Sequence, residues 1–299
     1  MTTQRILILA IAFTVSATAQ QPGKNIPVEK DIIYGRAGGV ELKLDLARPA
    51  EGVGPFPAVL CIHGGGWQLG DKRLYGDLIR GLASRGFVAA SMDYRLTPRF
   101  AWPAQIEDVK CAVRFLRAHA AEYRIDADRL GVLGDSAGGH LALMAGLTGP
   151  GDGFDSASCG DPRVSSKVQA IVDFFGPADL TSFRVPKESE PLLIRDYGWD
   201  SNQVLFNLLG SRDRSAPVFR QASPITYIDP ADCPVLIFHG TADNLVSIEQ
   251  SKALDRALAK AGVSHRLEIV EGEGHGWTGA KLERSITQAI EFLDKILKR

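Results

Sequence analysis

The first chemically suggestive group in this sequence is a serine between glycines. Residues 134–138, GDSAG, match the pattern G-x-S-x-G around Ser136. The pattern follows an apolar run typical of a strand and precedes small residues typical of a helix. In such a unit the serine lies on a strained turn, and the flanking glycines avoid collisions with the adjacent strand and helix. A tight turn with an idle serine is the alternative, but this context favours a nucleophile for acyl transfer.

A serine nucleophile needs a base, because its hydroxyl is unreactive while it keeps its proton. His275 lies in a glycine-rich loop, EGEGHGW, directly after a strand-like segment at 265–271. The other five histidines lie at strand ends or starts, or within helices: His63, His119, His140, His239 and His265. His140 comes one helical turn after Ser136, so we expect it to pack under the serine turn. We therefore predict His275 as the base.

The base in turn needs an orienting acid. Asp243 directly follows the apolar run at 234–240, and carboxylates at the carboxyl ends of parallel strands face the crevice where ligands bind. Glu273 is too close in sequence to His275 for a rigid brace, and Asp179 is the second rival. We predict Asp243, which places serine, acid and histidine after three different strands in the order expected for a nucleophile-elbow enzyme.

Three consecutive glycines at 64–66 stand between His63 and Trp67, at the end of another apolar run. Acyl transfer builds negative charge on a carbonyl oxygen, which preorganised N–H groups stabilise. Without side chains, Gly65 and Gly66 can bring their amides close to a substrate. We predict an oxyanion hole from these two amides and that of Ala137, whereas Gly64 lets the turn close and His63 braces the loop.

The elements that position these residues alternate between continuous apolar runs and amphipathic segments. Continuous apolar runs indicate strands covered on both faces, as in a parallel sheet flanked by helices. Strands are predicted at 32–34, 40–46, 56–62, 87–94, 129–134, 169–176, 234–240 and 265–271, and helices at 75–85, 105–123, 137–147, 247–261 and 285–297. The first two strands read as a hairpin. This alternation predicts an α/β fold with a mostly parallel central sheet and helices on both faces.

One segment, 181–223, breaks the alternation because it is polar and rich in proline and glycine, with one short helix candidate at 204–209. A segment this long is more often functional than idle, so we predict a lid-like insertion. Phe183, Tyr197 and Trp199 in it are candidates for a lid or acyl pocket. Trp67 and Trp277 are further pocket candidates, although each indole has an alternative role in covering the sheet.

The first nineteen residues differ from the rest. An apolar run at 6–15 follows Arg5 and precedes the small-residue site Ala17-Thr18-Ala19, the layout of a secretory signal peptide. The run is short for a membrane span, which takes about 20 apolar residues. We expect cleavage after Ala19, a hydrolase domain over 20–299, no integral membrane segment after cleavage, and a secreted or periplasmic protein.

The net charge limits the classes of binding partner, and the cysteines bear on metal binding and disulfides. The formal net charge is −1 without a basic stripe, which argues against nucleic acid and anionic membranes as partners. The four cysteines show no metal-binding spacing. Cys159, in a polar loop, is the best candidate for a disulfide with an unassigned partner, whereas Cys61, Cys111 and Cys233 lie in apolar patterns, where free cysteine packs as a small hydrophobe. The oligomeric state cannot be inferred.

These segments together resemble the α/β-hydrolase superfamily, in its HGGG-bearing, hormone-sensitive-lipase-like branch of carboxylesterases, and are most similar to the bacterial feruloyl and acetylxylan esterase type. The resemblance is carried by HGGGWQLGDK (63–72), DYRL (93–96), WPAQIEDV (102–109), GDSAGGHLAL (134–143), GPADL (176–180), HGTADNLV (239–246) and GEGHGW (272–277). It implies the same catalytic residues, Ser136, Asp243 and His275, and the same oxyanion hole. One departure is residues 244–246 after the acid, where relatives often carry proline.

The resemblance implies a secreted serine esterase that needs no metal or cofactor. The expected substrates are acetyl or feruloyl esters of plant polysaccharide, or small aryl and alkyl esters. Two other functions stay open. A prolyl-oligopeptidase-like peptidase would share the acid and histidine segments, but the chain has no room for the additional propeller domain. A catalytically inactive hydrolase used as a binding module would usually have lost a triad member.

Overall fold

The computed structural model describes residues 25–156, 159–161, 163–185 and 200–298. Within them, eight strands form one sheet. Its spatial order is β1 (Val28–Ala37), β2 (Val40–Ala47), β4 (Val88–Met92), β3 (Phe56–Ile62), β5 (Ile125–Asp135), β6 (Ala170–Phe174), β7 (Val235–Gly240) and β8 (His265–Val270). β2 pairs antiparallel with β1 and β4, and every other pairing is parallel. The predicted mostly parallel sheet is confirmed.

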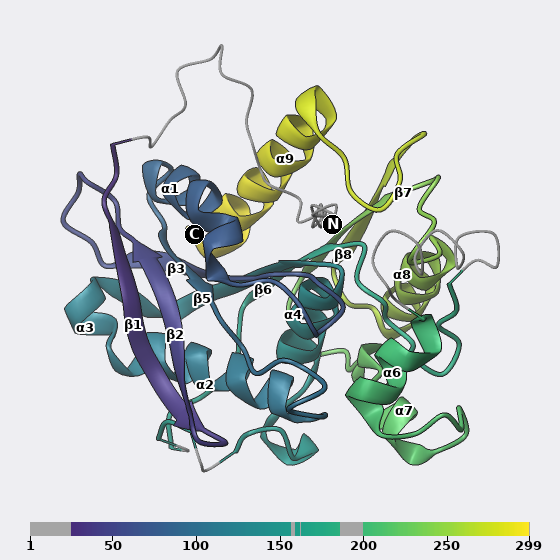
Figure 1. Ribbon diagram of the computed structural model, residues 1–299. Coiled ribbons are helices and arrows are strands. Elements are labelled where there is room, and N and C mark those ends of the chain that lie inside the picture. The colour runs from purple at the N-terminus through teal and green to yellow at the C-terminus, as the bar shows by residue number, and fades with distance from the viewer. Residues whose placement is uncertain (1–24, 157–158, 162, 186–199, 299) are drawn as a thin grey trace, which may run out of the picture.

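Helices cover both faces of this sheet, as predicted. α1 (Gly76–Ser84) and α9 (Gly279–Leu297) pack on one face, whereas α2 (Ala104–Ala118), α4 (Ala137–Leu147) and α8 (Glu249–Ala261) pack on the other (Figure 1). Successive side chains of β3 alternate between the two cores: Val59 and Cys61 join the α1–α9 side, and Leu60 and Ile62 join the α2–α4 side. Burial on both faces explains the continuous apolar runs.

Element ends differ from the prediction where polar residues obscure the pattern. β1 begins at Val28 instead of residue 32, because the edge strand exposes charged side chains that look like a loop in sequence. α9 begins at Gly279 instead of residue 285, because its first turns are polar and exposed. The predicted helix 105–123 is divided into α2 and the short α3 (Ala120–Tyr123).

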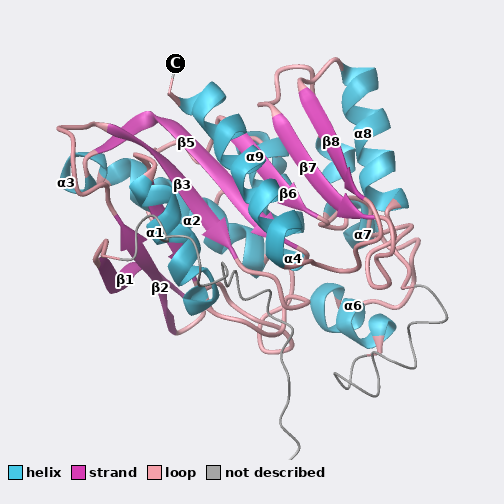
Figure 2. Cartoon of the chain, turned by 90° about the horizontal axis from the view of Figure 1, so that it is seen from above, coloured by secondary structure: helices cyan, strands magenta, loops and turns pink. Residues whose placement is uncertain are grey.

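The insertion between β6 and β7 is described from residue 200 onward and up to residue 185. It contains α6 (Ser201–Leu209) and α7 (Pro217–Gln221). The Asp200 side chain caps α6 by accepting from two backbone amides, and the helix ends at a left-handed glycine. Figure 2 shows α6 beyond the carboxyl ends of the central strands. Tyr197 and Trp199 of the predicted lid lie outside the described residues.

A disulfide joins Cys159 to Cys111 of α2, with a Cα–Cα distance of 5.6 Å. Cys159 was the predicted bridge candidate, but the expectation that Cys111 is free is wrong. Cys111 does lie on a buried helix face, yet that face meets the loop carrying Cys159, 48 residues along the chain. A glycine of β1, Gly35, makes room, since a Cβ there would lie 2.3 Å from the Cys159 sulfur. Cys61 and Cys233 are free and buried.

Residues 1–19, the predicted signal peptide, lie outside the described part of the chain. Among the helices that the structure describes, none combines the length and the apolar character required to cross a membrane.

Candidate active site

Ser136 lies on a strained turn between β5 and α4. Its φ and ψ angles are 52° and −118°, in a region that residues with side chains rarely adopt. The flanking positions require glycine because neighbouring backbone leaves no room for a Cβ atom. A Cβ on Gly134 would lie 2.2 Å from the Gly138 carbonyl oxygen, and one on Gly138 would lie 1.9 Å from that of Ile62. The turn therefore holds the serine hydroxyl at the carboxyl end of the sheet, as the G-x-S-x-G pattern predicts.

The structure brings the three predicted catalytic residues together. His275 Nε2 lies 2.9 Å from Ser136 Oγ, and His275 Nδ1 lies 2.8 Å from Asp243 Oδ2. They come from the segments after β8, β5 and β7, which end at the same edge of the sheet. The Asp243 carboxylate is fully buried, whereas the His275 side chain is 14% exposed and so can reach a substrate.

Asp243 is held as a carboxylate by a full set of donors. Its Oδ1 accepts hydrogen bonds from the amides of Leu245 and Val246, at 2.8 and 2.9 Å. Burial alone would raise the pKa of Asp243, but His275 and His239 outweigh burial and hold that pKa well below its usual range. The carboxylate therefore stays ionised and can orient and stabilise the His275 ring.

His239 is a site residue that the sequence reasoning treated only as a strand end. It is buried at the end of β7, with Nε2 2.8 Å from the Val246 carbonyl oxygen and 3.3 Å from Asp243 Oδ2. Its Nδ1 lies 2.6 Å from the Ser251 hydroxyl. Because Nε2 faces two acceptors, that nitrogen carries the proton. In the sequence, the position of His239 four residues before Asp243 is the signal that could have identified it as a site residue.

The glycine loop follows β3, and the amides of Gly65 and Gly66 are not used within the described residues. Gly65 and Gly66 have φ angles of 117° and 60°, and a Cβ on Gly65 would lie 2.2 Å from the Leu69 carbonyl oxygen. Among the described residues, no acceptor takes the amide hydrogens of Gly65, Gly66 or Ala137, the last in the first turn of α4. These are the three donors that the sequence predicts for an oxyanion hole.

Asp135 connects this loop to the nucleophile turn. Its Oδ1 accepts the Gly64 amide at 2.9 Å and also accepts the Tyr75 hydroxyl. A Cβ on Gly64 would lie 2.6 Å from the other Asp135 oxygen. Burial raises the pKa of Asp135, and the hydrogen bonds from Tyr75 and Gly64 oppose this. The residue before the nucleophile thus holds the loop that carries Gly65 and Gly66.

His63 braces the loop from the other side, as expected. Its Nδ1 donates to the Gly64 carbonyl oxygen at 2.8 Å, and its ring stacks on Tyr94 with centroids 4.4 Å apart. The Tyr94 hydroxyl donates to the His63 carbonyl oxygen at 2.9 Å.

Two of the three predicted pocket tryptophans are core residues, which corrects the expectation. Trp67 is 3% exposed and donates from Nε1 to His140 Nδ1 at 3.2 Å. Trp277 is 4% exposed, and its Nε1 donates to the Ser285 hydroxyl. The Trp67 indole therefore packs in the core on the α2–α4 side of the sheet, and the Trp277 indole packs in the core on the α1–α9 side. The third, Trp199, lies outside the described residues.

His140 packs under the serine turn, as expected from its position one helical turn after Ser136. It is fully buried, with Nδ1 accepting from Trp67 and Nε2 donating to the Ala222 carbonyl oxygen at 2.7 Å. If His140 Nδ1 were also protonated, its N–H would point at the N–H of Trp67, which is unfavourable. Burial lowers the pKa of both His140 and His63 to about 4.

Because the pKa values of His140 and His63 are lowered in the folded protein, we expect the protein to lose stability in acid. The unfolded chain takes up the protons near pH 6.5, above the folded pKa values, so it binds more protons than the folded chain as pH falls. We expect the free energy of unfolding to fall by about 1.4 kcal/mol per pH unit for each histidine between about pH 6.5 and pH 4. Urea unfolding across this range measures the slope. The variant His140→Gln should show a shallower slope, and an unchanged slope would contradict the assignment.

The arrangement as a whole is a hydrogen-bonded acid–histidine–serine chain, together with backbone amides that no acceptor among the described residues takes. That combination can activate a hydroxyl and stabilise an oxyanion, which acyl transfer requires. In the described part of the chain, no group of three or more His, Cys, Asp or Glu side chains is arranged to hold a metal ion.

Comparisons with known proteins find esterases among the relatives of this chain. Residues 44–258 match the family model BD-FAE. Two curated relatives come from Mycobacterium tuberculosis. The probable carboxylic ester hydrolase LipM is 32% identical over 253 residues, covering 79% of this chain and 54% of the relative. The esterase LipC is 32% identical over 250 residues, covering 81% and 59%. The chain thus spans little more than half the length of these relatives.

Solved structures are similar over almost the whole chain. A truncated form of a carbohydrate esterase from gut microbiota has a TM-score of 0.78 and 27% identity, covering 94% of this chain and 99% of that one. A thermophilic esterase of Thermogutta terrifontis, Est2, has a TM-score of 0.71 and 27% identity, covering 96% and 97%.

Proposed function

Because the chain belongs to the BD-FAE family of α/β-hydrolase esterases, we propose that it hydrolyses carboxylic esters through an acyl-enzyme on Ser136. The observation that carries this proposal is the continuous chain from Asp243 through His275 to Ser136, at 2.8 and 2.9 Å. It ends beside backbone amides that no described residue uses.

The chemistry follows from the positions of these groups. His275 Nε2 takes the proton of Ser136 as the serine oxygen bonds to the ester carbonyl carbon. The amides of Gly65, Gly66 and Ala137 donate to the oxyanion, and Asp243 stabilises the positive imidazole. His275 then gives its proton to the departing alcohol. A water molecule, deprotonated by His275, releases the acid and restores the serine.

Labelling with a fluorophosphonate probe tests the nucleophile directly. We expect one probe per chain, located on Ser136 by peptide mass spectrometry, together with hydrolysis of p-nitrophenyl acetate. Label on another residue, or a protein that neither reacts nor hydrolyses the ester, would reject the proposal and favour a binding module.

For the substrate, we infer acetyl or feruloyl esters on plant polysaccharide. Support comes from the carbohydrate esterase among the similar structures. The test is a panel of acetylated xylan, methyl ferulate, and short- and long-chain p-nitrophenyl esters. Higher kcat/KM on acetylated xylan or methyl ferulate is the expected result. A preference for small synthetic esters alone would point to a general carboxylesterase.

We further propose that the protein is exported after cleavage behind Ala19. The disulfide between Cys111 and Cys159 supports this, since such bonds persist in oxidising compartments. Amino-terminal sequencing of protein from the periplasm or culture medium should begin at Gln20. Full-length protein confined to the cytoplasm would contradict the proposal.

Substitution of Asp135 should show whether this residue positions the loop of Gly65 and Gly66 or contributes to substrate binding. In Asp135→Ala the Gly64 amide loses its acceptor, and the loop that carries Gly65 and Gly66 is released. We expect kcat to fall by a factor on the order of 10² with KM nearly unchanged, because an oxyanion hole acts in the transition state. Steady-state kinetics with p-nitrophenyl acetate gives both constants.

The matched variant is Asp135→Asn, whose amide oxygen can still accept from Gly64. It should recover most of the lost kcat. Equal losses in the two variants, or a loss expressed in KM, would assign Asp135 a different role.

A further inference from the structure

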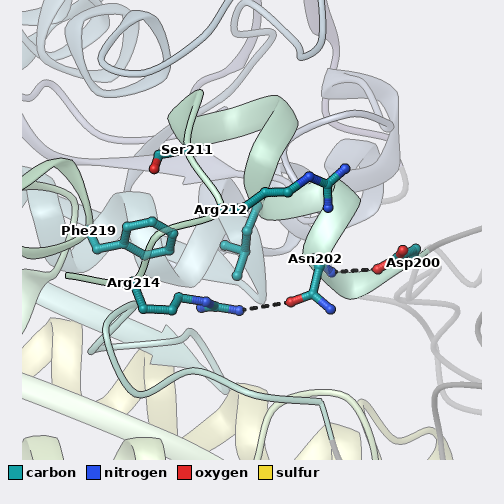
Figure 3. A pocket seen from close by; sticks show the side chains of 7 residues that line it. Asp200, Asn202, Ser211, Arg212, Arg214 and Phe219 are labelled. Atoms are coloured by element: carbon teal, nitrogen blue, oxygen red, sulfur yellow. Dashed lines mark hydrogen bonds between the residues drawn. The ribbon is translucent and has the colours of Figure 1, made fainter. Parts of the chain in front are cut away.

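A pocket lies outside the catalytic residues, between α6 and α7. Its volume is about 320 Å³, and Arg212 and Arg214 both contribute to its lining (Figure 3). Asn202 and Ser211 add polar groups, and Phe219 adds an aromatic wall. The volume is near the lower end for ligand pockets, and it is enough for one sugar ring.

Among the described residues that line the pocket, two arginines and one carboxylate give a net positive charge. Among the described residues, neither Arg212 nor Arg214 forms an ion pair with a carboxylate. The one acid in the lining, Asp200, accepts from the amides of residues 202 and 203 through Oδ1 as the cap of α6, and its negative charge offsets that of one arginine. Burial and the like charge of nearby Arg184 lower the pKa of Arg214. An anion in the pocket would relieve this repulsion.

The two arginines supply free donors to the pocket. Arg214 uses Nη1 on the carbonyl oxygens of Leu180 and Phe183, each at 3.1 Å, and Nη2 on the Asn202 side-chain oxygen at 3.3 Å. Its Nε–H and one Nη2 hydrogen stay available within the described part of the chain. Within the described residues, Arg212 uses Nη2 alone, on the Gln203 side-chain oxygen. Two arginines with free donors favour a ligand that carries acceptors and negative charge, and arginine pairs well with carboxylate.

The arginine geometry is set before any ligand arrives. The guanidinium of Arg214 lies over the ring of Phe219, with 5.0 Å between its carbon and the ring centroid. That of Arg212 lies 4.8 Å over the ring of Phe206 on α6. Flat groups held against aromatic rings lose little freedom on binding, which favours affinity.

The helix that lines this pocket also contacts the oxyanion loop. Asn207 of α6 donates to the Gln68 side chain at 2.9 Å, and Gln68 follows the glycines by two residues. The Trp102 amide donates to the Leu208 carbonyl oxygen at 2.8 Å. The pocket is therefore built on an element that is fixed against the catalytic machinery.

We propose that the α6–α7 pocket binds the carboxylate of a uronic acid unit in a polymeric ester substrate. This inference rests on the proposed esterase function, because it assigns the pocket to a part of the substrate that does not react. It predicts that the enzyme prefers acidic, glucuronate-bearing acetylated xylan to its neutral counterpart.

Direct binding tests the pocket without turnover. Isothermal titration of the Ser136→Ala protein with methyl glucuronide should show saturable binding, whereas methyl glucoside of the same size should not bind. Arg212→Gln should weaken glucuronide binding by about tenfold or more, the cost of one charged hydrogen bond. Arg220→Gln, on α7 but outside the lining, is the matched control and should bind as the parent does.

The outcomes separate this inference from the esterase proposal. Equal binding of glucuronide and glucoside, or no effect of Arg212→Gln in a protein with an unchanged unfolding transition, would overturn it. Inorganic phosphate binding as tightly as glucuronide would also overturn it, by showing a general anion site. Hydrolysis of p-nitrophenyl acetate by the wild type reports the esterase activity independently. For the active enzyme, Arg212→Gln should raise KM on acidic acetylated xylan and remove its preference over neutral polymer.

Discussion

Ser136→Ala is expected to lower kcat/KM for p-nitrophenyl acetate by a factor on the order of 10⁴ to 10⁶. The substitution removes the oxygen that forms the acyl-enzyme and leaves His275 without a proton to accept. A residual rate above that of water should persist, because the amides of Gly65, Gly66 and Ala137 still stabilise an oxyanion. Initial-rate kinetics, with fluorophosphonate titration to bound contamination by active enzyme, measures the loss.

The matched control is Ser84→Ala, an exposed serine near the end of α1 whose hydroxyl donates to the Gly81 carbonyl oxygen. It should keep wild-type kinetics. If Ser136→Ala retained a tenth or more of the activity, the G-x-S-x-G segment would be only a tight turn, and the nucleophile would lie elsewhere.

Asp243→Asn should have the second-largest effect, a loss of kcat on the order of 10⁴. Every group around this carboxylate is a donor: Oδ1 faces the amides of Leu245 and Val246, and Oδ2 faces His275. An asparagine must turn its NH₂ group toward one of these sets. If it turns toward His275, it stabilises the wrong tautomer. If it turns toward the amides, it buries donors without acceptors.

Steady-state kinetics and urea unfolding should therefore both respond to Asp243→Asn. Because the folded pKa of Asp243 is lowered, the stability it contributes is present above its usual pKa range and is lost as pH falls through the folded value. The stability difference from wild type should accordingly shrink in acid.

Asp179→Asn is the control for this prediction, since Asp179 was the rival acid in the sequence. Its carboxylate accepts from the Thr181 and Ser182 side chains. We expect at most a small change in kcat. A loss equal to that of Asp243→Asn would transfer the orienting role to Asp179.

Local sequence patterns were sufficient for much of the site. The glycines around Ser136 and at 64–65 mark places where the backbone approaches other atoms too closely for a Cβ, and this requirement shows in a few adjacent residues. Asp243 and His275 could be chosen because each lies in the segment that follows a strand, and parallel strands end at one edge of the sheet.

Contacts between distant segments could not be read in this way. Cys111 looked like a core residue, and only the packing of its helix against the loop of Cys159 makes it a disulfide partner. Trp67 and Trp277 lie close to predicted site residues in the sequence, but their side chains are buried in the core. The links from Asp135 to Gly64 and from His239 to Asp243 depend on side-chain direction, which spacing does not reveal.

The sequence by itself therefore determined the α/β architecture, the strand ends that carry the triad, and the loop that offers the amides, because periodicity and glycine placement are local. The tertiary structure alone decided what surrounds them. It paired Cys111, buried the two tryptophans, supplied Asp135 and His239 as supports, and placed Arg212 and Arg214 in the lining of one pocket. Those outcomes depend on which faces of distant elements meet when both sides of the sheet are buried.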